Sequence, residues 1–202
     1  MIRRIGVIYQ DQNSRGFLEG VRRRLNCDAM LVDQPAGIGR PRILPEKQAR
    51  LAWEHFQRKK VDLVVRLTDA DQTPWQSVRT TELKNIPPQA NSLWVCGVAV
   101  ENIEEWLCLE PGYLAEALGI PKSDLSSAQN RTGVVKRAIA TQRRAEEDPS
   151  GVVARIVCEA PGEVFRRWLQ DDAFQAFYVD CRAAANRAGC ETLNELDKPT
   201  NE

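Results

Sequence analysis

Leu63-Val64-Val65-Arg66-Leu67-Thr68-Asp69-Ala70-Asp71 is the stretch of sequence that decides the fold. Its first half is an almost continuous apolar run, interrupted by Arg66, of the kind found in buried parallel strands. We predict further strands at residues 5–9, 29–32 and 93–100. Helical patterns lie between them: one that Ser14 can cap, one at residues 45–60 and a short one after residue 71. Strands that alternate with helices indicate an α/β fold with a doubly wound, mostly parallel four-stranded sheet.

The second half of the chain is almost wholly helical in pattern. Helical spacing covers residues 103–109, 113–118, 131–147, 152–159, 164–169 and 173–188. We therefore predict an α/β core over residues 1–110 and a helical extension, packed on the core, over residues 111–193. Residues 194–202 are polar, and we expect a disordered tail there.

Composition excludes several classes of protein. Basic and acidic residues balance at 28 each among 202 residues, so a nucleic-acid-binding surface would have to be a local patch. The sequence has neither an apolar stretch long enough to cross a bilayer nor a signal peptide, so we expect a cytoplasmic protein. The six cysteines form no Cys-x-x-Cys pair and the only histidine is His55, which argues against a zinc site and against a Cys-His or Ser-His-Asp enzyme.

Acidic and polar residues follow the predicted strands. In an open α/β sheet, ligands bind at the carboxyl ends of the strands. Three of those ends carry Gln10 and Asp11, then Asp69 and Asp71, then Glu101 with Glu104 and Glu105. Two carboxylates and several waters suit Mg²⁺, and such a cluster favours a bound cation or a raised pKa. The alternative interpretation is that Asp-x-Asp after a strand is ordinary turn and helix-cap chemistry.

A basic segment follows in the predicted helix at residues 131–147. On a helix, several of its side chains can form a cationic stripe for phosphate contacts. The predicted nucleic-acid-binding residues are Arg131, Lys136, Arg137, Arg143 and Arg144. The alternative is a solvated helix face with intrahelical ion pairs.

Four segments carry a family resemblance. The helix that begins Ser14-Arg15-Gly16-Phe17-Leu18-Glu19-Gly20-Val21 resembles the first helix of a Toprim domain, and residues 67–71 resemble its Asp-x-Asp motif. Residues 97–107, with Ile-Glu-Glu-Trp-Leu at 103–107, resemble a signature of a bacterial Toprim-like family related to OLD-type (overcoming lysogenisation defect) nucleases. Asp172 to Phe177 is similar to that family's closing segment, so the resemblance covers most of the chain.

The resemblance implies phosphodiester chemistry that depends on Mg²⁺ or Mn²⁺. Asp69 and Asp71 then hold the metal with Glu104 in support, and Lys136 matches a lysine in the helix after the Trp-Leu signature. Gln10 stands where the family has a glutamate, and it cannot take a proton. Losing general acid–base help costs about 10²–10⁴-fold in rate. Asp11 is adjacent, but successive strand residues point to opposite faces, so only a local bulge or turn lets it substitute.

Three functions stay open at this point. The first is a nuclease-like subunit of an anti-phage defence or mobile-element system that works with a separately encoded ATPase, since the sequence has no Gly-x-x-x-x-Gly-Lys-Ser/Thr loop of its own. The second is a catalytically degenerate Toprim scaffold that binds a protein partner or nucleic acid. The third is a phosphotransfer or phosphohydrolase protein for small molecules. Self-association into a homo-oligomer is compatible with each.

Overall fold

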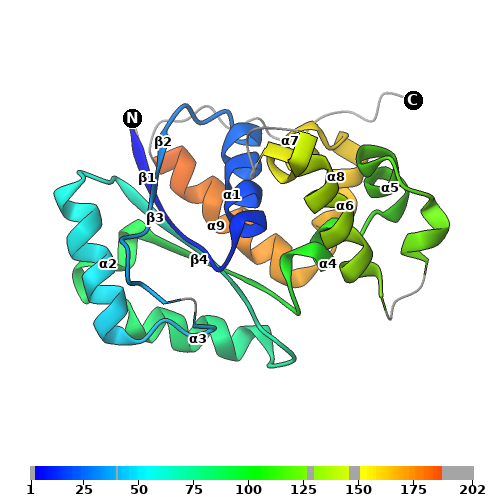
Figure 1. Ribbon diagram of the computed structural model, residues 1–202. Coiled ribbons are helices and arrows are strands. Elements are labelled where there is room, and N and C mark those ends of the chain that lie inside the picture. The colour runs from blue at the N-terminus through cyan, green and yellow to red at the C-terminus, as the bar shows by residue number, and fades with distance from the viewer. Residues whose placement is uncertain (1–2, 40, 127–129, 146–150, 188–202) are drawn as a thin grey trace.

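A four-stranded sheet forms the centre of the molecule (Figure 1). The computed structural model describes residues 3–39, 41–126, 130–145 and 151–187, with only the backbone at 143–145. The strands are β1 (Arg4–Ile8), β2 (Met30–Asp33), β3 (Leu63–Asp69) and β4 (Trp94–Ala99), in the order β2-β1-β3-β4. Every pairing is parallel, so the predicted doubly wound α/β fold is confirmed and the sheet is wholly parallel.

The path of the chain places a switch point at the carboxyl edge of this sheet. From β1 the chain passes through α1 (Gln12–Arg24) to β2, and α2 (Glu46–Arg58) then carries it back past β1 to β3. It continues through α3 (Trp75–Asn85) and the 3₁₀ helix η1 (Pro88–Leu93) to β4. Because the direction of winding reverses between β1 and β3, their carboxyl ends form the switch point at which such folds bind ligands.

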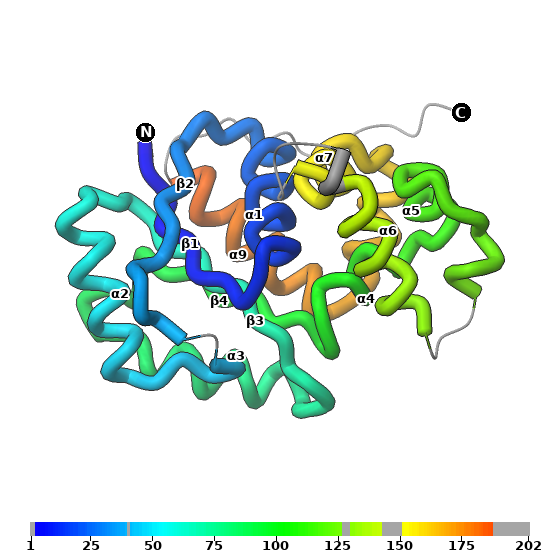
Figure 2. The backbone as a smooth tube through the Cα atoms, in the orientation of Figure 1, coloured from blue at the N-terminus to red at the C-terminus, as the bar shows by residue number. Residues whose placement is uncertain are grey.

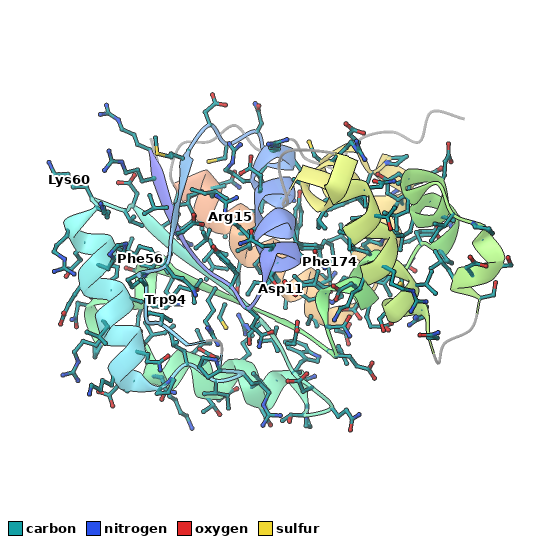
Figure 3. All side chains as sticks on the ribbon, viewed as in Figure 1. Asp11, Arg15, Phe56, Lys60, Trp94 and Phe174 are labelled. Atoms are coloured by element: carbon teal, nitrogen blue, oxygen red, sulfur yellow. The ribbon has the colours of Figure 1, made fainter. Side chains whose placement is uncertain are left out.

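Alternation along β3 divides the core between the two faces of the sheet. Leu63, Val65 and Leu67 pack with α1 on one face, whereas Val64 packs with Phe56 of α2 on the other. Figure 3 shows Phe56 on the α2 side, with Asp11 at the start of α1. The approach of α2 is close, because a Cβ at Gly6 would lie 2.8 Å from the ring of Phe56.

The helices after β4 complete the core on the α1 face. They are α4 (Ile103–Leu107), α5 (Pro111–Leu118), the 3₁₀ helix η2 (Lys122–Leu125), α6 (Arg131–Ala145), α7 (Gly151–Glu159), α8 (Gly162–Trp168) and α9 (Asp172–Arg187). Helix α7 runs beside α1, and α9 packs on β4 (Figure 2). Trp106 of α4 stacks on Phe177 of α9 with ring centroids 5.9 Å apart. One apolar cluster therefore joins the sheet to these helices; residues 188–193 of the predicted extension and the predicted tail at 194–202 lie outside the described residues.

Two further sequence expectations concern membranes and cysteines. Within the described ranges, no helix has both the length and the apolar character needed to cross a membrane. Among the described residues, Cys27, Cys96, Cys108 and Cys181 form no disulfide and are buried in the apolar core, as expected of cysteines that act as small hydrophobes.

Candidate functional site

Asp69, the last residue of β3, is the centre of the candidate site. Its backbone N–H donates a 3.3 Å hydrogen bond to Oε1 of Gln10, which follows β1 across the switch point. Its carboxylate is partly buried, and the buried Oδ1 has no hydrogen-bond partner among the described residues. Burial raises the pKa of Asp69 to about 7, and the charges of Glu104, Asp11 and Asp71 add to the rise. Carboxylates that follow β1, β3 and β4 therefore act on one another at this edge.

Asp11 reaches this cluster because β1 ends early. The strand stops at Ile8, so the alternation that would turn Gln10 and Asp11 to opposite faces no longer applies. Asp11 is the N-cap of α1: its Oδ1 accepts from the backbone N–H of Ser14 at 2.8 Å and from Ser14 Oγ at 2.9 Å. The prediction that Ser14 caps this helix was wrong, because the N-cap is Asp11, three residues earlier.

Asp71 lies in a tight turn directly after Asp69. Asp71 and Gln72 have φ angles of 46° and 66°, in the left-handed region, and the Asp71 side chain is exposed. The turn is fixed by the N–H of Ala70, which donates to the carbonyl of Ala99 at 2.8 Å, and by that of Thr73, which donates to Ala70 at 3.0 Å. Asp71 thus takes part in turn chemistry, as the alternative interpretation expected, and also adds negative charge beside Asp69.

Glu104 is the most deeply buried carboxylate of the site. It lies in the first turn of α4, which Asn102 caps by accepting from the N–H of Glu105. Only 2% of Glu104 is exposed. Its Oε1 accepts a 2.6 Å hydrogen bond from Nδ2 of Asn13, and its Oε2 lies 3.6 Å from Nζ of Lys136. Glu104 therefore joins α1 and α6 at the edge of the sheet.

Helix α6 supplies basic side chains to this edge. Lys136 is half exposed beside Glu104, and Arg131 makes an ion pair with the neighbouring Glu105. Arg137 is exposed next to Lys136, whereas the side chains of Arg143 and Arg144 lie outside the described residues. Of the predicted stripe, Lys136 is the residue that the fold brings to the carboxylates, and Arg131 is held by Glu105.

Sequence reasoning missed a buried ion pair between β3 and α3. Arg66 of β3 and Glu82 of α3 are 1% and 2% exposed, and their charged atoms lie 2.8 Å apart. Arg66 also donates to the carbonyls of Pro41 and Arg42, and Glu82 accepts from the N–H of Leu44 at 2.6 Å. The pair thereby fixes the long Gly- and Pro-rich segment that leads from β2 to α2. A charged residue inside an apolar strand was the available signal.

Asn13 was also missed, although it is part of the site. It follows Asp11 on the first turn of α1, is 8% exposed and bonds to Glu104. Its own Oδ1 is buried and has no hydrogen-bond partner among the described residues. An asparagine at the start of a helix is so common as a capping residue that its position alone gave no functional signal.

The donor atoms of the site suit a hard cation with a partial water shell. No group of three or more His, Cys, Asp or Glu side chains in the described part of the chain is arranged to hold a metal ion. Two buried oxygens, Asp69 Oδ1 and Asn13 Oδ1, nevertheless have no hydrogen-bond donor among these described residues. Mg²⁺ keeps several waters and takes few protein oxygens, so this arrangement fits such an ion better than one that needs a full protein cage.

Comparisons with protein-family models, curated proteins and solved structures find no match to this chain.

Proposed function

We propose that this protein is a Mg²⁺- or Mn²⁺-dependent hydrolase of nucleic-acid phosphodiesters built on a Toprim-like core. One observation carries the proposal: a partly buried carboxylate, Asp69, lies at the switch point with a pKa raised to about 7 and with an oxygen that has no hydrogen-bond partner in the described part of the chain. Perturbed carboxylates at a ligand-binding edge are typical of functional sites. The motif resemblance of residues 67–71 and 97–107 supports the choice of reaction.

The proposed roles follow from position and charge. Asp69 and Asp71 hold the cation, and Glu104 supports them from the buried side of the cluster. Lys136, half exposed beside Glu104, contacts a phosphate of the substrate. A cation held there would neutralise phosphate charge and would lower the pKa of an attacking water. Gln10, which follows β1, orients Asp69 by accepting a hydrogen bond from its backbone N–H. Asp11 is the adjacent carboxylate.

The resemblance also suggests the biological setting. Proteins of this kind act as nuclease subunits in anti-phage defence or mobile-element systems, together with a separately encoded ATPase. In this proposal, the ATPase supplies the motor and recognition functions, and the cationic stripe of α6 supplies phosphate contacts. Cytoplasmic action is part of the same proposal.

A degenerate Toprim scaffold is the second candidate function, and specific observations favour it. Gln10 accepts a hydrogen bond from the backbone of Asp69, which is a structural use of the side chain. Both carboxylate oxygens of Glu104 face internal donors, Asn13 and Lys136. A scaffold that binds a protein partner or nucleic acid requires these contacts but no proton transfer.

Metal binding and DNA cleavage, measured on the same variants, separate the two candidates. Mn²⁺ and Mg²⁺ are titrated into the protein by calorimetry, and supercoiled plasmid is incubated with each metal. Asp69→Asn/Asp71→Asn is compared with Asp124→Asn, which changes an exposed aspartate of η2. Loss of binding and of nicking in the double variant alone supports the hydrolase. If the wild-type protein neither binds metal nor cleaves DNA, even with the separately encoded ATPase added, the hydrolase is contradicted and the scaffold is favoured.

A further inference from the structure

The orientation of the Asn13 side chain is fixed by its neighbour. A carboxylate accepts hydrogen bonds and does not donate them, so the amide nitrogen of Asn13 must face Glu104, at 2.6 Å from Oε1. The amide oxygen then points away from Glu104, and it is buried without a hydrogen-bond partner among the residues that the structure describes. More than nine-tenths of Asn13 is buried, which makes an unsatisfied oxygen costly.

The surrounding cluster contains more acceptors than donors. Asp69 Oδ1 is a second buried oxygen with no hydrogen-bond partner within the described ranges, and the charges of Asp11, Asp71 and Glu104 act on Asp69. Lys136, a cation beside them, lies 3.6 Å from Glu104 and is half exposed. A hydrated divalent cation supplies what this arrangement lacks, because the ion accepts oxygen ligands and its waters donate hydrogen bonds.

We propose that Asn13 is a positioning residue for this cation: its Nδ2 holds Glu104 in place, and its Oδ1 binds the ion or one of the ion's waters. The inference rests on the proposed function and adds to it a residue that the resemblance does not assign. A neutral oxygen suits this position, since it adds a ligand without adding charge to a cluster that already repels itself. Bonds of this kind orient the ligating carboxylates of metal sites.

Three variants test the role of Asn13. Asn13→Ala removes both the donor to Glu104 and the oxygen while keeping a good helix former. Asn13→Asp keeps an oxygen, loses the donor and adds a charge. Gln12→Ala is the matched control, because Gln12 is exposed on the same turn of α1. Each variant is titrated with Mn²⁺ by calorimetry, and its thermal unfolding is recorded with EDTA and with Mn²⁺.

We expect Asn13→Ala to weaken Mn²⁺ binding by about 10- to 100-fold and Gln12→Ala to leave it unchanged. In EDTA, Asn13→Asp is expected to unfold at a lower temperature than wild type. Mn²⁺ should raise its unfolding temperature by more than it raises that of wild type, and Asn13→Asp should bind Mn²⁺ at least as tightly. The inference is overturned if Asn13→Ala binds Mn²⁺ with wild-type affinity. It is also overturned if Mn²⁺ raises the unfolding temperature of Asn13→Asp by no more than that of wild type. If Asn13→Ala does not fold, Asn13→Asp decides alone.

The proposed function and this inference fail in different ways. If Asp69→Asn abolishes Mn²⁺ binding while Asn13→Ala binds as wild type does, the metal site stands and the role of Asn13 is overturned. If the wild-type protein itself binds no Mn²⁺, both are overturned.

Discussion

Oε1 of Gln10 accepts a 3.3 Å hydrogen bond from the backbone N–H of Asp69, so one side chain joins the ends of β1 and β3 at the switch point. The Toprim resemblance expects a glutamate at this position. A glutamate carboxylate accepts the same hydrogen bond, because the donor is a backbone N–H. The structural role of Gln10 is therefore open to either residue, whereas proton transfer is open to glutamate alone.

Gln10→Glu should restore general acid–base chemistry if the hydrolase proposal is right. We expect plasmid nicking in Mn²⁺ to increase by about 10²–10⁴-fold. Without metal, the added charge beside Asp11 and Asp69 should lower the free energy of unfolding at neutral pH. Initial nicking rates and urea denaturation of the two proteins check these outcomes. A variant that is less stable without metal yet no more active favours the scaffold function.

Asp69 makes stability depend on pH. Its pKa in the folded protein is about 7, against an ordinary value of 3.8, so between these values the folded state binds more protons than the unfolded state. Stability therefore falls as the pH rises through this window, and the full penalty is present above about pH 7. Asp69→Asn should unfold at a higher urea concentration than wild type at about pH 8, with a gain of up to about 4 kcal/mol, and should match it near about pH 4.

The control for this prediction is the exposed Asp124→Asn on η2. It should change the free energy of unfolding by no more than about 0.5 kcal/mol at any pH, as surface substitutions do. An Asp69→Asn variant that follows the wild-type pH dependence would show that burial and the neighbouring carboxylates do not perturb Asp69. In that case, the observation that carries the proposed function is lost.

Much of the fold could be predicted because its signals are local. The apolar run predicts a strand at residues 62–67, where the structure has one at residues 63–69, and the helices after Ile103 are predicted by their spacing. The position of Asp69 at a strand end was predictable for the same reason. Parallel strands place their carboxyl ends together, which brings Asp11, Asp69 and Glu104 near one another.

Other contacts in the site are not local and left little trace in the sequence. The bond from Asn13 to Glu104 joins residues 91 positions apart, and the partner of Lys136 depends on how α6 packs against α4. The end of β1 at Ile8 was missed because an apolar run does not show where strand pairing stops. This early end lets Asp11 lie in the site. Tertiary packing, rather than propensity, sets these features.

Gly97 of β4 tests how closely α9 packs on the sheet. A Cβ at this position would lie 2.5 Å from Cδ2 of Phe177, so Gly97→Ala should overpack the core and cost about 1–3 kcal/mol. Gly112→Ala is the matched control: on α5 its Cβ would meet only the flexible Nζ and Cε of Lys122, at 3.6 and 3.9 Å. That change should be neutral or stabilise the helix by up to about 1 kcal/mol. Equal urea midpoints for the two variants would contradict close packing of α9 on β4.

The buried pair of Arg66 and Glu82 should show strong energetic coupling. Arg66→Met leaves a buried carboxylate without its partner, and we expect a loss of about 3–5 kcal/mol in the free energy of unfolding. Burial already raises the pKa of Glu82 and Arg66 opposes the rise, so the single variant should also bind a proton. Arg66→Met/Glu82→Gln should recover part of the loss, because the glutamine amide is uncharged and its oxygen can still accept from the N–H of Leu44.

A double-mutant cycle in urea and limited proteolysis of the segment at residues 34–45 check this prediction together. The segment loses the Arg66 hydrogen bonds to Pro41 and Arg42 in both variants, so cleavage there should be faster than in wild type even where stability is partly restored. If the loss in the double variant equals the sum of the losses in Arg66→Met and Glu82→Gln alone, the pair is not coupled. Unchanged cleavage would mean that the bond from Thr68 Oγ1 to Arg42 holds the segment without Arg66.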